Sequence, residues 1–133
     1  MHGATRQADW REQANEMGEL PVLQAGARRL TQSGLILRYL AKKHGALGGN
    51  TGDEENEVLR WLLFDNHKFT SYFATYRFMK AFGPNAPDPS VMAWLHGRLG
   101  GAFANVDKHL STQLDMVCSV PTIADFSPSG YLF

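Results

Sequence analysis

The stretch GELPVLQAGARRLTQSGLILRYLAKKHG, from Gly18 to Gly45, predicts a β-hairpin followed by a helix. The segments LPVLQ and ARRLT are apolar or β-tolerant and are joined across Ala25-Gly26, where glycine provides the freedom that a tight turn needs. From Ser33 apolar residues recur at helical spacing as far as Gly45, which can adopt the left-handed conformation that ends a helix. A two-stranded hairpin is marginal in water, so we expect it to need partners.

Two further helices are predicted on either side of this stretch. Asp9 to Met17 is helix-compatible, with Gly18 as its stop. After a loop, Thr51 fits a capping box in which Glu54 reaches back to the Thr51 amide, and apolar residues then keep helical spacing as far as Gly83-Pro84. That run has more apolar surface than one packing stripe requires, so part of it should meet something besides the core.

The next helix should begin at Asp88 as cap, with Pro89 at the first helical position, where its missing amide costs nothing. Three glycines in it each weaken a helix by about 1 kcal/mol relative to alanine, which indicates close backbone packing. They are Gly97, Gly100 and Gly101. Its buried stripe is expected to consist of Val91, Leu95, Leu99, Phe103, Val106 and Leu110.

The segment PTIADF predicts one more helix, with Thr122 and Asp125 as a second capping box. Pro128 cannot donate to the carbonyl four residues earlier, and its ring crowds that carbonyl. We therefore expect the helix to kink or end near Ser127 and to leave Tyr131 to Phe133 loosely ordered.

Composition limits the class of protein. The 133 residues are 44% hydrophobic and 20% charged, enough for a sizeable core, and thirteen basic residues balance thirteen acidic ones, which favours neither nucleic acid nor a membrane surface as partner. The single Cys118 excludes an intramolecular disulfide, and no apolar run reaches membrane-spanning length. These two features lead us to expect a cytoplasmic location. The five histidines lack Cys/His ligand spacing, so we expect no metal site.

Four motifs, in order and at suitable spacing, resemble the landmarks of cytosolic glutathione S-transferases of the bacterial type. They are LPVL at 20–23, LTQS at 30–33 leading into LILRYLA, then EVLRWLLFDNHKF, and PTIADFS. The resemblance implies a mostly α fold, with residues 1–46 as a partial thioredoxin-like domain and 51–133 as a partial all-α domain. It also implies truncation at both ends, because the family's first strand, first helix and second strand, and its last helices, have no counterpart here.

The resemblance assigns a glutathione site to the hairpin and the helix after it. It implies a cis bond between Leu20 and Pro21, backbone contacts from Val22 to the cysteinyl part of glutathione, and contacts from Gln32 and Ser33 to the γ-glutamyl end. Ser33 stands at a helix N-terminus, where free amides and the macrodipole favour an anion. The residues by themselves leave open an edge-strand proline and an ordinary helix cap.

Further residues are candidates for a dimer contact to glutathione and for an electrophile pocket. By its spacing after RW, Asp65 resembles the aspartate that some family members extend across the dimer to glutathione's amino group; the alternative is a solvated helix carboxylate. Tyr72, Phe73 and Tyr76 could line an apolar site for an electrophile, because such pockets are mostly aromatic and apolar. Aromatic residues at helical spacing are more often part of a core.

Two functions remain open. In the first, the chain is a glutathione transferase that joins glutathione, as co-substrate, to a small apolar electrophile, with the catalytic residue unknown. In the second, it is a non-catalytic glutathione-transferase-like module that serves association. A homodimer is expected in both, because two strands without sheet partners leave an unpaired edge.

Overall fold

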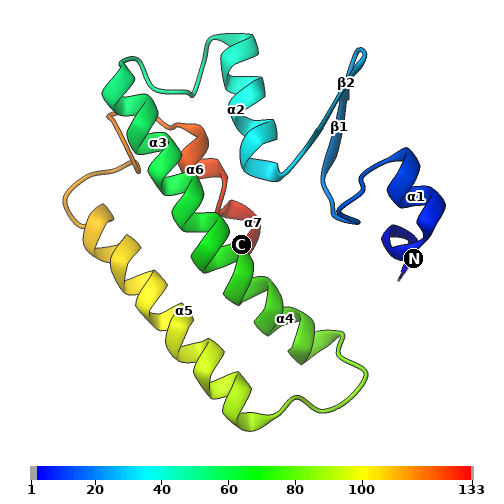
Figure 1. Cartoon of the computed structure of the whole chain (residues 1–133). Coiled ribbons are helices and arrows are strands. Elements are labelled where there is room, and N and C mark those ends of the chain that lie inside the picture. Colours follow the sequence, from blue (N-terminus) through cyan, green and yellow to red (C-terminus); the bar gives the residue numbers. More distant parts are fainter. Residues whose placement is uncertain (1–2, 133) are drawn as a thin grey trace. The chain divides into compact units, whose positions relative to one another are not determined.

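The computed structural model describes residues 3–132 and divides the chain into two compact units, one extending to His44 and one beginning at Gly45 (Figure 1). The first unit contains the short 3-10 helix η1, helix α1, a two-stranded sheet and helix α2. In chain order these are η1 Ala4–Arg6, α1 Ala8–Gln13, β1 Val22–Ala25, β2 Arg28–Thr31 and α2 Ser33–His44. The fold is therefore mostly helical with a small antiparallel sheet, as predicted.

The predicted hairpin is present, but its turn lies one residue later than the predicted Ala25-Gly26. Strands β1 and β2 are antiparallel, and Val22 pairs with Thr31 at one end while Ala25 pairs with Arg28 at the other. The turn therefore consists of Gly26 and Ala27. Gly26 has a φ of 61°, in the left-handed region that favours glycine. The Leu20-Pro21 peptide bond is cis, which confirms the prediction.

Helix α1 ends earlier than expected, at Gln13. Asn15 takes over the local hydrogen bonds: its Oδ1 accepts from the Met17 amide at 3.1 Å, and its Nδ2 donates to the Glu19 carbonyl at 2.8 Å. An asparagine side chain that bonds nearby backbone offers the chain an alternative to the helix. The prediction that the helix continues to Met17 is therefore wrong.

The second unit is helical (Figure 1). The long helix predicted after Thr51 is three consecutive segments: α3 Gly52–Asp65, a π-helical segment η2 Asn66–Phe73, and α4 Ala74–Ala81. After a loop come α5 Pro89–Leu110, α6 Ile123–Phe126 and α7 Ser129–Leu132. Within the described chain, none of the helices combines the length and apolar character that spanning a membrane requires.

The first predicted capping box is half correct. The Thr51 hydroxyl accepts from the Glu54 amide at 3.2 Å, but the Glu54 carboxylate accepts from the Asn50 amide at 2.6 Å instead of the predicted Thr51 amide. At the start of α5 the Asp88 carboxylate accepts from the Ser90 amide at 2.7 Å, with Pro89 at the first position as predicted.

The core of the second unit lies where α5 packs against η2 and where α6 packs against α3. Phe69 of η2 is 1% exposed, and its ring stands edge-on to that of Phe103 at 5.2 Å. On α5, two residues of the predicted stripe, Leu95 and Leu99, are buried. Ala102, which was not part of the prediction, is buried as well. Three residues of the predicted stripe are exposed: Val91, Phe103 and Leu110.

The glycines of α5 do not make the predicted close packing. A Cβ added at Gly97, Gly100 or Gly101 would meet no atom of the described chain within 4 Å, apart from the helix's own neighbouring backbone. Their absent side chains therefore leave space on the surface of α5, and the packing interpretation is wrong for this chain taken alone.

The second capping box is complete. The Asp125 carboxylate accepts from the Thr122 amide and from the Met116 amide, both at 2.8 Å, while the Thr122 hydroxyl accepts from the Ala124 amide at 3.3 Å. Helix α6 ends at Phe126, as Pro128 predicts. Tyr131 nevertheless lies in α7, with its ring 5.9 Å from that of Phe73, so the prediction of loose order is wrong there. Phe133 lies outside the described residues.

Candidate functional site

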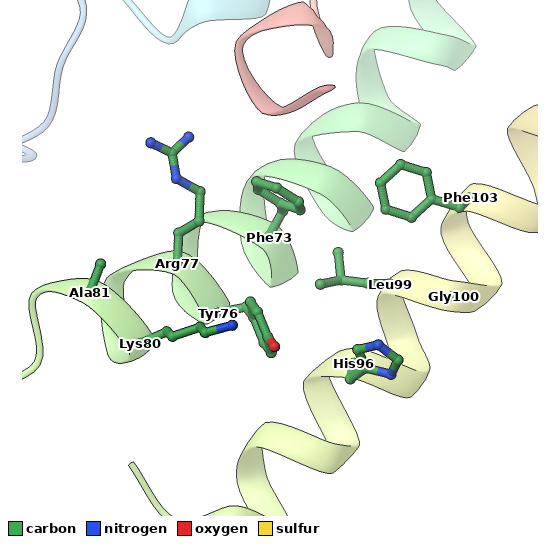
Figure 2. A pocket seen from close by; sticks show the side chains of 9 residues that line it. All are labelled: Phe73, Tyr76, Arg77, Lys80, Ala81, His96, Leu99, Gly100 and Phe103. Atoms are coloured by element: carbon green, nitrogen blue, oxygen red, sulfur yellow. The ribbon is translucent and has the colours of Figure 1, made fainter. Parts of the chain in front are cut away.

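A hollow of about 590 Å³ opens between α4 and α5 in the second unit (Figure 2). Its apolar lining consists mainly of Phe73, Leu99, Phe103 and the ring of Tyr76. Gly100 widens it, because an added Cβ there would meet nothing within 4 Å. The volume lies within the range of about 300–1,000 Å³ that small-molecule pockets occupy, and apolar aromatic walls are typical of them.

Nitrogen-bearing side chains border this hollow. Arg77 and Lys80 come from α4, and His96 comes from the facing helix α5 (Figure 2). The Lys80 ammonium lies 5.7 Å from the centre of the Tyr76 ring, and the Tyr76 and His96 rings are 6.5 Å apart. None of the lining residues is acidic. An apolar floor with cationic neighbours can hold an apolar body and, beside it, a negative charge.

The three predicted electrophile residues divide between two faces. Phe73 and Tyr76 line the hollow, whereas Tyr72 does not. The Tyr72 hydroxyl accepts from Arg98 Nη2 at 3.0 Å, and its ring stands edge-on to Trp94 at 5.6 Å. Neighbouring residues on a helix point in different directions, whereas residues three or four apart share a face. That spacing would place both Phe73 and Tyr72 on the face of Tyr76, so the contacts of Tyr72 with Arg98 and Trp94, and not the spacing, separate it from the hollow.

Four of the five predicted glutathione residues lie together at one end of the hairpin in the first unit; the fifth, Asp65, lies in the second unit. Val22 pairs with Thr31, so Pro21, which precedes Val22, lies near Gln32 and Ser33, which follow Thr31. Gln32 has a φ of 67°, and its side-chain amide donates to the Glu19 carboxylate at 3.0 Å. Helix α2 begins at Ser33, and the first intrahelical bond runs from the Ile36 amide to the Gln32 carbonyl.

Asp65 is buried and not solvated, so the alternative of a solvated helix carboxylate is wrong. Its side chain is 5% exposed, one carboxylate oxygen accepts from the Ser127 hydroxyl, and the other has no partner among the described residues. Burial raises the pKa of Asp65, and the Ser127 hydrogen bond opposes that shift. The carboxylate therefore points to Ser127 at the C-terminal end of α6 in the same chain, and it does not line the hollow.

Sequence reasoning missed seven residues of the hollow: Arg77, Lys80, Ala81, His96, Leu99, Gly100 and Phe103. A local charge count would have found the first two, because residues 66–106 contain four Lys or Arg against one acid. No group of three His, Cys, Asp or Glu that could hold a metal ion occurs among residues 3–132.

The known proteins that this chain is similar to are glutathione S-transferases. No protein-family model matches the chain. Rabbit (Oryctolagus cuniculus) glutathione S-transferase Mu 1 is 37% identical over 71 residues, which is 50% of this chain and 31% of that protein. The crystal structure of a glutathione S-transferase from Xanthobacter autotrophicus matches with a TM-score of 0.87 at 27% identity, over 98% of this chain and 64% of that one.

A glutathione transferase from Phanerochaete chrysosporium, solved in complex with oxidized glutathione, shares the fold at a TM-score of 0.82 and 22% identity. That match covers 95% of this chain and 60% of the fungal one. The chain thus spans less than a third of the curated relative and less than two thirds of these solved structures.

Proposed function

We propose that this chain, which is glutathione S-transferase-like in sequence and fold, binds glutathione through Pro21, Val22, Gln32 and Ser33. The hollow bordered by Phe73 and Tyr76 is then the place for the apolar electrophile that glutathione attacks. A cytoplasmic location fits this proposal, because glutathione keeps the thiols of that compartment reduced.

The observation that supports the proposal is the register of the hairpin. Because Val22 pairs with Thr31, the start of β1 and the start of α2 lie at the same end of the sheet. There the unbonded amides of the first turn of α2 attract a carboxylate, and the helix macrodipole adds to the attraction. The backbone of Val22 is a natural partner for a peptide group such as that of the cysteinyl residue.

The chemistry of conjugation requires a thiolate. A thiol with a pKa near 8.5 is only a few per cent ionised at pH 7, and a transferase gains rate by raising that fraction and by orienting the sulfur. No described side chain is assigned as the donor that stabilises the thiolate. We therefore propose a binding protein with conjugation barely above the uncatalysed rate, in which the Tyr76 hydroxyl is the first candidate donor to test.

Calorimetric titration with reduced glutathione tests the binding. We expect weak binding that Ser33→Ala reduces further, because a helix N-terminus without its hydroxyl holds an anion less well. Ser111→Ala is the matched control, since Ser111 stands at the opposite end of a helix, the C-terminus of α5, and its hydroxyl donates to the Lys108 carbonyl. Equal affinity in the wild type and Ser33→Ala would remove Ser33 from the proposed site.

Conjugation is measured separately with a chloronitrobenzene-type electrophile. Turnover far above the uncatalysed rate would overturn the proposal of a poorly catalytic chain, and its loss in Tyr76→Phe would then identify the donor.

The alternative is a non-catalytic association module. It is favoured by large apolar side chains that the described chain leaves exposed, including Leu63, Phe78 and Trp94. The two functions differ in one readout, because an association module forms a homodimer without binding glutathione.

A further inference from the structure

A second, smaller cavity lies between η2 and α5, and it shares no lining residue with the hollow between α4 and α5. Its volume of about 200 Å³ suits one small group, because pockets for whole organic ligands occupy about 300–1,000 Å³. None of its lining residues is acidic. We call it the basic cleft, and it is lined by Lys68 of η2 and, on α5, by Gly97, Arg98, Gly101, Ala102 and Asn105.

Two glycines of α5 keep the basic cleft open. Gly97 and Gly101 are four residues apart, so they lie on the same face of the helix. A Cβ added at either position would meet no atom of the described chain within 4 Å, apart from the helix's own neighbouring backbone. Asn105 is four residues further along and shares this face. The floor of the cleft is therefore helix surface without side chains, and polar side chains stand around it.

The two cations of the basic cleft both lie beside the ring of Tyr72. The Arg98 guanidinium is 5.2 Å from the ring centre, and the Lys68 ammonium is 5.8 Å from it. Arg98 Nη2 donates to the Tyr72 hydroxyl at 3.0 Å, which orients the guanidinium. Neither cation has an ion-pair partner within residues 3–132. Like charges held near each other without a counter-ion repel, and an anion between them removes that repulsion.

The donors around the basic cleft match an oxyanion with several acceptor oxygens. A guanidinium carries N–H donors in a planar fork that fits phosphate, and Tyr72 accepts from one nitrogen of Arg98. The Lys68 ammonium and the Asn105 side-chain amide add further donors. A phosphate monoester carries about 1.5–2 negative charges at pH 7, which balances the two cations.

We propose that the basic cleft binds a phosphate group, with Lys68 and Arg98 as its charged ligands and Asn105 as a further donor. The group is either inorganic phosphate or the phosphate monoester of a larger ligand. Trp94 is 57% exposed, and its ring lies 5.9 Å from the Arg98 guanidinium, so it would contact the body of a larger ligand. The proposal does not rest on the glutathione site, whose hairpin residues belong to the first unit.

Titration with sodium phosphate, followed by two-dimensional ¹H–¹⁵N NMR, tests the binding. Sodium chloride at the same ionic strength is the reference, because salt screens exposed charges in general. We expect saturable shifts of the Gly97 and Gly101 amides and of the Asn105 side-chain amide, with a dissociation constant on the order of 1 mM. If phosphate produces no saturable shift beyond that of chloride, the proposal is overturned.

Two neutral variants test the assigned ligands. Lys68→Gln and Arg98→Gln should each weaken phosphate binding about threefold to fivefold, since exposed cations each contribute modestly. Arg98→Lys, which keeps the charge and loses the planar fork, should fall between Arg98→Gln and the wild type. Lys108→Gln, in the last turn of α5 and outside the cleft, is the matched control and should change nothing. Unchanged affinity in both neutral variants would remove Lys68 and Arg98 from the site and overturn the proposal.

A glycine variant locates the binding. Gly101→Glu would place a carboxylate in the basic cleft, where an added Cβ meets nothing within 4 Å, and should abolish phosphate binding. Gly101→Gln has the same size without the charge, and its smaller loss would attribute the effect to charge. Unchanged affinity in Gly101→Glu would mean that phosphate binds elsewhere, which overturns the cleft as its site.

Phenyl phosphate distinguishes the two sources of the phosphate group. If it displaces inorganic phosphate and binds more tightly, and Trp94→Ala removes the difference, the ligand is a phosphate monoester with an aromatic body. Displacement with equal affinity supports free phosphate as the ligand. Failure of either phosphate to displace the other would show that they do not share the basic cleft, and the proposal of one phosphate site would be wrong.

Discussion

Removal of one hydroxyl, in Ser127→Ala, tests whether Asp65 and Ser127 couple α3 to the end of α6. The two residues are 62 positions apart in sequence, and the Ser127 hydroxyl donates to one carboxylate oxygen of Asp65. The other oxygen has no partner among the described residues, and the side chain is 5% exposed. The hydroxyl is therefore the one hydrogen-bond donor that the described chain offers to this buried carboxylate.

The expected loss of stability follows from the charge on the acceptor. A hydrogen bond to a charged group contributes about 1.5–3 kcal/mol, so we expect Ser127→Ala to lower the free energy of unfolding by about 2 kcal/mol at pH 7. With a urea dependence of about 2 kcal/mol/M, the unfolding midpoint should fall by about 1 M.

The effect should depend on pH in a defined direction. Burial raises the pKa of Asp65 above its ordinary value of 3.8, although the Ser127 bond opposes the shift. The folded state thus holds this proton more tightly than the unfolded state does, so the stabilisation from Asp65 is complete below the unfolded pKa and is lost as pH rises through the folded one. The Ser127→Ala loss should grow over the same range, because the bond strengthens when the carboxylate ionises.

Urea unfolding followed by circular dichroism, from about pH 4 to pH 8, measures both quantities. Ser129→Ala is the matched control: its hydroxyl, two residues away, donates to the Phe126 carbonyl, which is neutral. Its loss should be smaller and independent of pH. Asp65→Asn should abolish the pH dependence assigned to Asp65. A Ser127→Ala loss below about 0.5 kcal/mol at pH 7, or one that shrinks as pH rises, would refute the reasoning.

Three further predictions concern local conformation and assembly. Thr122→Ala should cost about 1 kcal/mol in urea unfolding, because the cap of α6 is lost; an unchanged midpoint would contradict this. Gly45→Ala should lower the free energy of unfolding by about 1 kcal/mol, because Gly45 has a φ of 63°. Gly100→Ala should raise it by up to about 1 kcal/mol, because Gly100 lies in the interior of α5 with open space around it. Equal effects of the two substitutions would be evidence against the argument. Sedimentation velocity at micromolar concentration should show a dimer, because large apolar side chains are exposed, and a clean monomer would remove that expectation.

The sequence by itself determined the local features of this protein. Thr122 with Asp125, and Asp88 with Pro89, mark the starts of α6 and α5, because their side chains satisfy amides only two or three residues away. Gly45 ends α2 because its left-handed conformation is available to glycine at no steric cost. The hairpin followed from two β-tolerant segments and a glycine turn, but its register did not, because the turn lies one residue later than predicted. The grouping of Pro21 and Val22 with Gln32 and Ser33 came from the family resemblance.

Only the tertiary structure decided which faces of the helices meet. The π-helical segment from Asn66 to Phe73 leaves no periodic signal, and it sets Tyr72 toward Trp94 while Phe73 and Tyr76 line the hollow. The partner of Asp65 lies 62 residues along the chain, beyond the reach of any local pattern. Burial and pairing depend on packing between segments that are distant in sequence, and packing is decided by the whole arrangement of the unit rather than by neighbouring residues.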